Sequence, residues 1–211
     1  NSNSLDHYEG YDVSATADFS DLPFVGGDLR VQLQWTHLVE NTTVDATGVS
    51  DDYVGQCYDF GESCFNRDRS TGLFTWSKGD WTVNWVTRFM SGISAPEDAL
   101  NYFDVANGGA NPYTGAAFPA GVLEDVMDTY SIEDYYYHNA SVSYQYDDNT
   151  RVNVAITNVF DEEAPYYKSF FGFVDPQINT PQNTYDIVGQ YVTASVSVSY
   201  THLRAHETCP Y

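Results

Sequence analysis

The sequence predicts an all-β protein: an antiparallel transmembrane β-barrel fragment of about seven strands, with short periplasmic turns and long extracellular loops. Two observations lead to this prediction. In seven stretches, apolar and polar residues alternate at every second position, as they do in a strand with two different faces. The connections between these stretches are alternately short and long, which is typical of outer-membrane barrels.

The first three strands are expected over residues 12–19, 29–38 and 71–77. In the first, Val, Ala and Phe alternate with Asp, Ser and Thr. In the second, Val31, Leu33 and Trp35 alternate with Arg, Gln and Thr. The third stretch is shorter and more ambiguous, although its Phe and Trp fall on one face. Each polar face consists of side chains that water can wet.

The other four strands are expected over residues 80–90, 139–146, 151–160 and 192–198. The first of these has Trp81, Val83, Trp85 and Phe89 on one face, and Thr, Asn and Arg on the other. The next two alternate Ala, Val, Ile and aromatic residues with Ser, Asn, Gln and Thr. The last alternates Val and Ala with Thr and Ser, so all four fit a period of two.

The connections have a strict parity. Compact turns rich in Gly, Pro, Asp and Asn lie at 20–28, 78–80 and 147–150. The gaps at 41–70, 91–130 and 161–184 are far longer. Unstructured loops of that length are unusual inside a compact soluble domain and ordinary outside a barrel. A soluble β-sandwich is therefore the poorer interpretation.

Aromatic residues are abundant, with 18 Tyr, 12 Phe and 4 Trp. Aromatics are favoured where a barrel meets the membrane interfaces, and they are also good strand formers in general. Near the two ends of one strand we expect a girdle that comprises Tyr135, Tyr136, Tyr137, Tyr144 and Tyr146. No run of about 20 apolar residues suitable for a membrane-spanning helix is present.

The formal net charge is −22, from 8 Lys and Arg against 30 Asp and Glu. Binding to phosphate backbones needs a basic surface, so a nucleic-acid partner is excluded. The acids concentrate in the predicted outer loops, where a solvated acidic face is favoured over a cation site and no EF-hand spacing occurs. The sequence contains no nucleophile elbow, zinc helix motif or phosphate loop. We therefore expect no catalytic, cofactor or metal residues, and no enzyme.

Two of the three cysteines, Cys57 and Cys64, lie close together in the first long loop. In an exported protein such a pair can close a small disulfide-bonded loop, and we favour this over free thiols. Neither the spacing nor the neighbouring residues support a zinc site.

The two ends of the chain are expected to differ from those of the whole protein. The chain starts at Asn1 without a signal-peptide pattern, and an odd strand number predicts at least one missing upstream strand. Residues 198–211 are expected to be a non-native tail, because 198–208 resemble the translation of a transposase-type sequencing adapter. A natural periplasmic tail is the alternative. His202, His206 and Cys209 are accordingly not interpreted as a metal site.

The stretch Asn158-Val159-Phe160-Asp161, with Pro165 shortly after it, precedes Tyr185-Asp186-Ile187-Val188-Gly189-Gln190 and a final alternating strand. This arrangement resembles the C-terminal end of TonB-dependent outer-membrane receptors. The chain departs from that pattern at Gln190, where the family usually has Arg, and in the missing terminal aromatic residue. Gly10-Tyr11-Asp12 also resembles a strand entry of that family, and Cys57 and Cys64 with Asn66 and Arg67 resemble one of its loops. The resemblance covers most of residues 8–197.

The resemblance implies a location in the bacterial outer membrane and active uptake of a scarce nutrient, such as a siderophore, a vitamin or an oligosaccharide. It implies four partners: outer-membrane lipid, a plug domain of the same protein, the TonB complex reached through the missing N-terminal part, and a small-molecule substrate. Residues 1–197 would then be the C-terminal part of the barrel, without the plug and the N-terminal strands. The alternatives are a passive porin-like channel and a secreted β-rich binding module.

Two groups of residues are candidates for contact with the plug or the substrate. Strand parity places on the lumen side Arg30, Gln32, Gln34, Asn84, Arg88 and Arg151. Aromatic residues of the long loops could stack on substrate rings. These loop aromatics are Tyr53, Tyr102, Phe103, Tyr113 and Phe118.

Overall fold

The structure, a computed structural model, describes residues 5–44, 47–48, 50–57, 64–94, 108–111, 114–121, 131–167, 180 and 184–199. Within these ranges it contains one antiparallel sheet. The strands are β1 (Leu5–Phe19), β2 (Asp28–Val44), β3 (Ser50–Asp52), β4 (Asp68–Lys78), β5 (Trp81–Met90), β6 (Tyr135–Gln145), β7 (Thr150–Thr157) and β8 (Tyr191–Val198).

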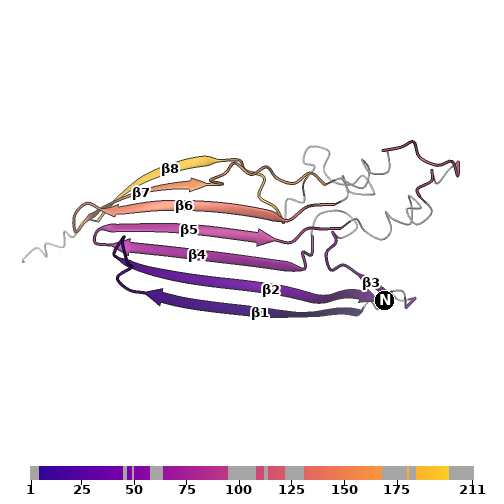
Figure 1. The fold of residues 1–211 in the computed structure, drawn as a ribbon, viewed down its shortest axis with the longest axis horizontal. Helices are drawn as coiled ribbons and strands as arrows, with labels where there is room; N and C mark the ends of the chain where they lie inside the picture. Colours follow the sequence, from indigo (N-terminus) through magenta and orange to yellow (C-terminus); the bar gives the residue numbers. More distant parts are fainter. Residues whose placement is uncertain are drawn as a thin grey trace, which may run out of the picture.

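Seven strands form a meander in the order β1-β2-β4-β5-β6-β7-β8, and the short β3 pairs with β2 outside this path. Because each strand pairs with its neighbour in sequence, all short turns lie at one end of the sheet and all long connections at the other (Figure 1). We call these the turn end and the loop end. The sheet is open, with β1 and β8 at its two edges. The predicted all-β fold and the parity of its connections are confirmed.

The strand boundaries differ from the prediction mainly at the loop end. β1 begins at Leu5 and β2 continues to Val44, so this hairpin is longer than the alternating stretches indicated. A bulge at Glu9/Gly10 carries the pairing onward. Gly10 is required there, because a Cβ atom at this position would lie 2.7 Å from the carbonyl oxygen of His37. Gly10 is therefore inside β1 and not at its entry.

Strand register separates the side chains into an apolar face and a polar face. One rung across the apolar face contains Ala17, Val31, Phe74, Trp85, Ala140, Ile156 and Val192. The neighbouring rung on the polar face contains Asp18, Arg30, Thr75, Asn84, Ser141, Ala155 and Thr193. The period of two in each stretch is thus kept in register across all seven strands.

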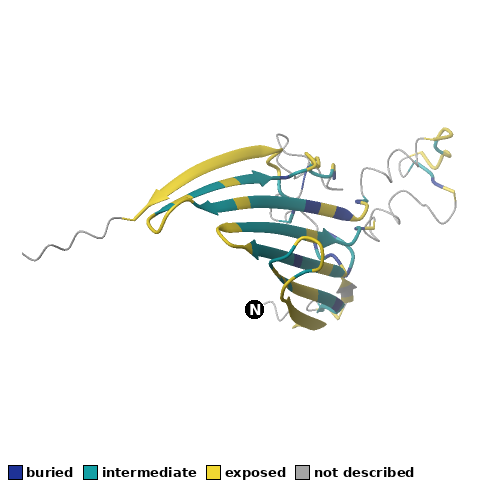
Figure 2. Cartoon of the chain, turned by 60° about the vertical axis from the view of Figure 1, so that its left-hand side comes forward, coloured by how far each residue is buried: buried dark blue, intermediate teal, exposed yellow. Residues whose placement is uncertain are grey.

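The buried core lies at the loop end. Its described members are Cys57, Cys64, Ile93, Ile132, Tyr135, Tyr137, Tyr167 and Tyr185. Most of them belong to the long connections, and Tyr135 and Tyr137 come from the polar face of β6, level with Thr36 and Gln34 of β2. The two edge strands, by contrast, are exposed along their whole length (Figure 2). The core therefore fills the space above one end of the polar face and not the apolar face of the sheet.

The predicted tyrosine girdle is wrong for two of its members. Tyr136 lies on the apolar face and is 50% exposed, whereas Tyr135 and Tyr137 are 4% and 1% exposed inside the core. Because side chains alternate along a strand, three consecutive tyrosines cannot all face the membrane. Tyr144 shares the apolar face with Trp81, and Tyr146, just beyond β6, is exposed at the turn end.

Candidate functional site

The predicted lumen-facing residues all lie on the polar face. Arg30 and Asn84 occupy one rung, and Gln34 and Arg88 occupy a rung nearer the loop end. Gln32 lies between these rungs on β2, and Arg151 lies on β7 near the turn end. The structure therefore brings the six residues onto one surface and spreads them from the turn end to the loop end.

Hydrogen bonds between side chains link neighbouring strands on this face. Thr75 Oγ1 donates to Asn84 Oδ1 at 2.9 Å, and Asn84 Nδ2 donates to Ser141 Oγ at 3.3 Å. Farther along the sheet, Ser143 Oγ donates to Asn153 Oδ1 at 2.8 Å. Such cross-strand pairs stabilise a sheet and fix its register.

The arginines of the polar face have different partners. Arg30 Nε lies 2.7 Å from Asp18 Oδ1, and Arg151 Nε donates to Gln145 Oε1 at 2.9 Å. Arg88 lies over the ring of Tyr137, with its Cζ atom 4.6 Å from the ring centroid. Its Nη2 is also 3.7 Å from Asp186 Oδ2, so Arg88 connects the sheet to the connection before β8.

The disulfide between Cys57 and Cys64 closes the first long loop, whose two cysteine positions also form an antiparallel bridge. Cys64 N donates to Thr184 Oγ1 at 3.1 Å, although the two residues are 120 positions apart. Ser94 N donates to Gly55 O at 2.9 Å. The disulfide loop therefore contacts both other long connections.

Where the long connections meet, Asn66 is the buried polar centre of a group of residues and is 3% exposed. We call this group the loop cluster; it comprises Cys64, Asn66, Arg69, Ser91, Tyr185 and Asp186. Its Nδ2 donates to Ser91 O at 2.7 Å and to Tyr185 Oη at 3.0 Å, and its Oδ1 accepts from Arg69. Burial raises the pKa of Tyr185 above its ordinary value, against the opposing influence of Asn66 and Arg69. The cluster thus holds the neutral form of this phenol.

A tight turn after β7 is built around Asn158, which is fully buried and has φ 55°. Its Nδ2 donates to Glu162 O, and its Oδ1 accepts from Glu162 N, both at 2.8 Å. Gln190 closes the turn from the other side: its backbone N donates to Asp161 Oδ1 and its Nε2 donates to Val159 O, both at 2.8 Å. The Gln that departs from the family pattern is therefore an integral part of this turn.

The predicted loop aromatics are only partly covered by the described ranges, because Tyr102, Phe103 and Tyr113 lie outside them. Tyr53 stands beside Phe65 in the disulfide loop, with ring centroids 6.4 Å apart. Phe118 belongs to a small hairpin of the second long connection, where its backbone N donates to Gly109 O.

Two groups of residues were not predicted. Arg69, Asn66 and Asp186 take part in the loop cluster, and no local pattern marks them, because their partners come from distant loops. Their only signal was their position beside Cys64 or within the Tyr185-Asp186 motif.

Among the described residues, His7, Glu9 and Glu40 are the one grouping of potential metal-ligating side chains. His7 and Glu9 are exposed and Glu40 is half-buried, and exposed acidic groups are common without an ion.

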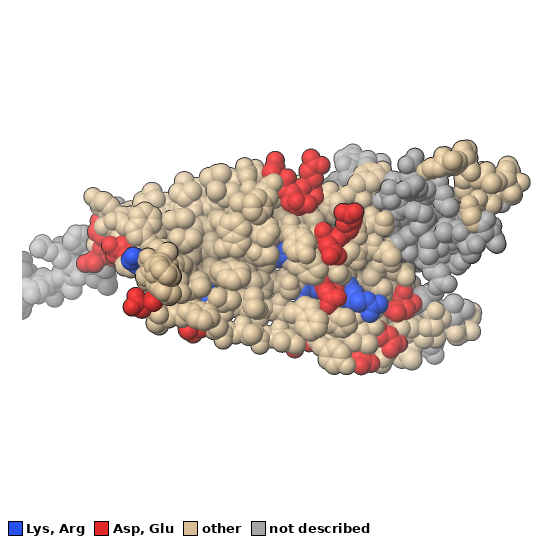
Figure 3. Space-filling model, in the orientation of Figure 1, with Lys and Arg blue, Asp and Glu red and all other residues tan. Residues whose placement is uncertain are grey.

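The apolar face is bare. Its exposed side chains include Val13, Leu33, Trp35, Trp81, Tyr136, Val142, Val154, Val192 and Val196. A continuous apolar surface of this extent indicates contact with another apolar phase. In the view of Figure 3, the acidic and basic side chains gather toward the two ends of the strands and leave the middle mostly uncharged.

Aromatic pairs border this face at both ends. Trp81 packs on Tyr144 near the turns, with centroids 4.5 Å apart, and Phe89 packs on Tyr136 near the loops, at 4.9 Å. Phe89 lies eight positions after Trp81 along β5. At about 3.4 Å per residue and a barrel tilt of roughly 40°, the height between the pairs is about 20 Å, close to the apolar band of about 25 Å in membrane barrels. Within the described ranges, no helix has the length and apolar character needed to cross a membrane.

Solved structures provide the comparison. The sheet is similar to part of the siderophore receptor PirA from Acinetobacter baumannii, with a TM-score of 0.52 and 17% sequence identity over 92% of this chain. The sheet has the fold of part of a TonB-dependent receptor barrel. A variant of the ferric enterobactin receptor PfeA from Pseudomonas aeruginosa shows the same likeness, with a TM-score of 0.51 and 11% identity over 92% of this chain.

The similarity to the TonB-dependent receptor barrels is one of fold. The chain spans 22% of the length of PirA and of PfeA. PirA is described as a siderophore receptor and PfeA as a ferric enterobactin receptor. No protein-family model and no curated protein matches the sequence.

Proposed function

We propose that this chain is part of an outer-membrane receptor that actively takes up a scarce nutrient with energy supplied through TonB. The distribution of burial supports this most directly. The apolar face of the sheet is exposed, and the buried cluster of the described residues lies on the polar face beneath the loops. In a soluble sandwich the apolar face would be the core. Here the apolar face is exposed and the polar face carries the buried cluster. Lipid around the outside of a barrel and loops that cover one of its ends explain this arrangement.

In this proposal the two faces have separate tasks. The apolar face contacts lipid, and backbone pairing between neighbouring strands satisfies the polar groups of the main chain in hydrocarbon. The polar face contacts a plug domain or lines the route of the nutrient, through Arg30, Asn84, Arg88 and their neighbours. Loop aromatics such as Tyr53 and Phe118 capture the nutrient. Because the named neighbours are siderophore receptors, a siderophore is the first candidate, before a vitamin or an oligosaccharide.

The domain organisation follows from the same proposal. Residues 1–197 would be the C-terminal part of the barrel, and 198–211 a non-native tail, most of which lies outside the described residues. Long-read sequencing of the source locus tests this. We expect a signal peptide, a TonB-contacting segment and a plug domain upstream. Soon after Ser197 we expect an aromatic residue followed by the stop codon. A reading frame that continues unchanged through 198–211 would refute the assignment of the tail.

An uptake assay tests the activity. The complete gene would be expressed in a Gram-negative host that lacks its own siderophore receptors, in otherwise identical strains with and without TonB. Labelled ferric siderophores, cobalamin and maltooligosaccharides would be offered one at a time. We expect accumulation of one class, which is lost in the strain without TonB. Accumulation that does not depend on TonB would instead identify a passive channel.

A further inference from the structure

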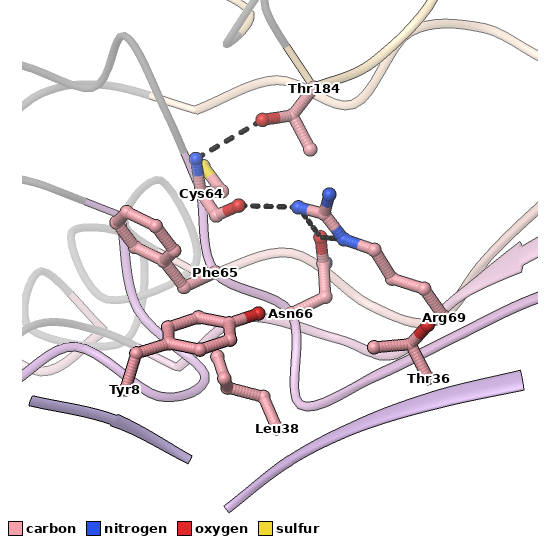
Figure 4. A pocket seen from close by; sticks show the side chains of 8 residues that line it. All are labelled: Tyr8, Thr36, Leu38, Cys64, Phe65, Asn66, Arg69 and Thr184. Carbon is pink, nitrogen blue, oxygen red and sulfur yellow. Dashed lines mark hydrogen bonds between the residues drawn. The ribbon is translucent and has the colours of Figure 1, made fainter. Parts of the chain in front are cut away.

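A pocket of about 400 Å³ lies on the polar face at the loop end, beneath the disulfide loop (Figure 4). Its walls come from parts of the chain that are far apart in sequence. They comprise Tyr8, Thr36, Leu38, Cys64, Phe65, Asn66, Arg69 and Thr184. Figure 4 shows the rings of Tyr8 and Phe65 on one side and the guanidinium of Arg69 on the other. The described lining thus combines aromatic surface, two threonines and one charged group.

The charge of this pocket is opposite to that of the chain. Among the described residues that line it, Arg69 is the one with a charged side chain, whereas the net charge of the chain is −22. Arg30 and Arg88 on the same face are paired with Asp18 and Asp186. No carboxylate of the described residues forms an ion pair with Arg69. Its positive charge is therefore available to an anion that enters the pocket.

The guanidinium of Arg69 is also held in place. Its Nε and Nη2 donate to Asn66 Oδ1 at 3.2 and 3.0 Å, and Nη2 donates to Cys64 O at 2.5 Å. Asn66 is itself fixed by Ser91 and Tyr185. These bonds use three of the five N–H groups of the guanidinium. The two on Nη1 have no acceptor among the described residues, so one edge of a fixed guanidinium remains for a ligand.

We propose that this pocket binds a small aromatic anion: a ring that carries a carboxylate or phenolate oxygen. The anionic oxygen accepts from Arg69 Nη1, because charge-assisted hydrogen bonds to a held guanidinium are strong. The ring packs against Tyr8 and Phe65. The inference rests on the proposed function in one respect, that the anion is an arm of the transported nutrient. Binding itself needs neither TonB nor transport.

Direct binding to the purified full-length protein in detergent tests the pocket. The probes are salicylate and its neutral amide, salicylamide, measured by calorimetry at low and at high salt. Wild type is expected to prefer salicylate at least tenfold, which corresponds to about 1.4 kcal/mol. Arg69→Gln should remove this preference while binding of salicylamide stays unchanged. Arg69→Lys should retain part of the preference for salicylate, since the positive charge remains although the fixed planar guanidinium is lost.

A matched control removes a cation elsewhere. Lys78→Gln, at the last residue of β4 and far from the pocket, changes the net charge by the same amount and should keep the preference of wild type. Circular dichroism and heat resistance in detergent would verify the folding of each variant. A wild-type protein without preference, or an Arg69→Gln protein that retains it, would overturn the proposal. TonB-independent uptake together with salicylate binding would refute the proposed function alone.

Discussion

Asn158 shows how one residue fixes a connection. Its positive φ is tolerated by Asn better than by most residues, and its amide bonds both ways to the backbone of Glu162. Its backbone N also bonds to the sheet, donating to Asn139 Oδ1 of β6 at 2.9 Å. A single buried side chain thus joins the end of β7 to the turn that follows.

Replacing this side chain should destabilise the turn. We expect Asn158→Ala to lower the free energy of unfolding by about 2–3 kcal/mol, because two buried hydrogen bonds are lost and their backbone partners remain unsatisfied. Denaturant unfolding of the full-length protein in detergent measures the change. Asn149→Ala in the exposed turn between β6 and β7 is the control and should change stability by less than about 0.5 kcal/mol. Equal effects in the two variants would contradict this role of Asn158.

The phenol of Tyr185 makes the loop cluster sensitive to alkali. Burial raises its pKa above the ordinary value of about 10, so the folded state favours the protonated form. The stabilisation is therefore fully present below pH ~10 and is lost as the pH rises through the raised pKa. Protease cleavage of the loops should increase there. Tyr185→Phe removes the titrating group, so a profile unchanged by this substitution would refute the explanation.

At the scale of the strand, the two faces of β6 predict opposite tolerance to charge. Val142 faces outward between Val83 and Val154, whereas Ser141 lies on the polar face beside Asn84. We expect Val142→Lys to cost about 2–4 kcal/mol near the membrane midplane, and Ser141→Lys far less. Reversible unfolding of the full-length protein from phospholipid vesicles measures both. Similar losses at the two positions would contradict the assignment of the lipid-facing side.

The disulfide loop is the second element with a clear prediction. Reducing Cys57–Cys64, or replacing both by Ser, frees the carbonyl of Cys64 that holds Arg69. The loop should then be cut faster by protease, and the preference for salicylate should fall, while β-sheet content measured by circular dichroism stays the same. Unchanged salicylate binding after complete reduction would show that the disulfide is not needed to hold Arg69 in the pocket.

The elements were predictable because their signal is local. A period of two is visible within eight residues, and the seven predicted stretches correspond to the seven strands of the meander. The loop cluster was not predictable, since its contacts join residues as distant as Cys64 and Thr184. Tyr135 and Tyr137 illustrate the difference: alternation separates them from Tyr136, but only the loops above them explain why they are buried.

At the scale of the whole molecule, the open sheet predicts how the chain behaves alone. Both edge strands are exposed along their full length, and unpaired edges promote association. The chain expressed without the rest of a barrel should sediment as aggregates in detergent-free buffer and disperse in detergent. A soluble monomer without detergent would favour the secreted β-rich module. Analytical ultracentrifugation distinguishes these outcomes.

The chemical groups of the polar face determine what kind of surface can pack against it. Near the turns it presents hydroxyl, amide and guanidinium groups, including those of Asn84 and Ser141, whereas near the loops aromatic rings such as Tyr8 and Phe65 border it. A domain or ligand that covers the polar face must supply hydrogen-bond donors and acceptors near the turns, because a buried polar group left without a partner costs about 1–3 kcal/mol. The polar face is therefore graded along the strand direction, so a molecule moving along it from the loop end to the turn end would exchange ring contacts for hydrogen bonds.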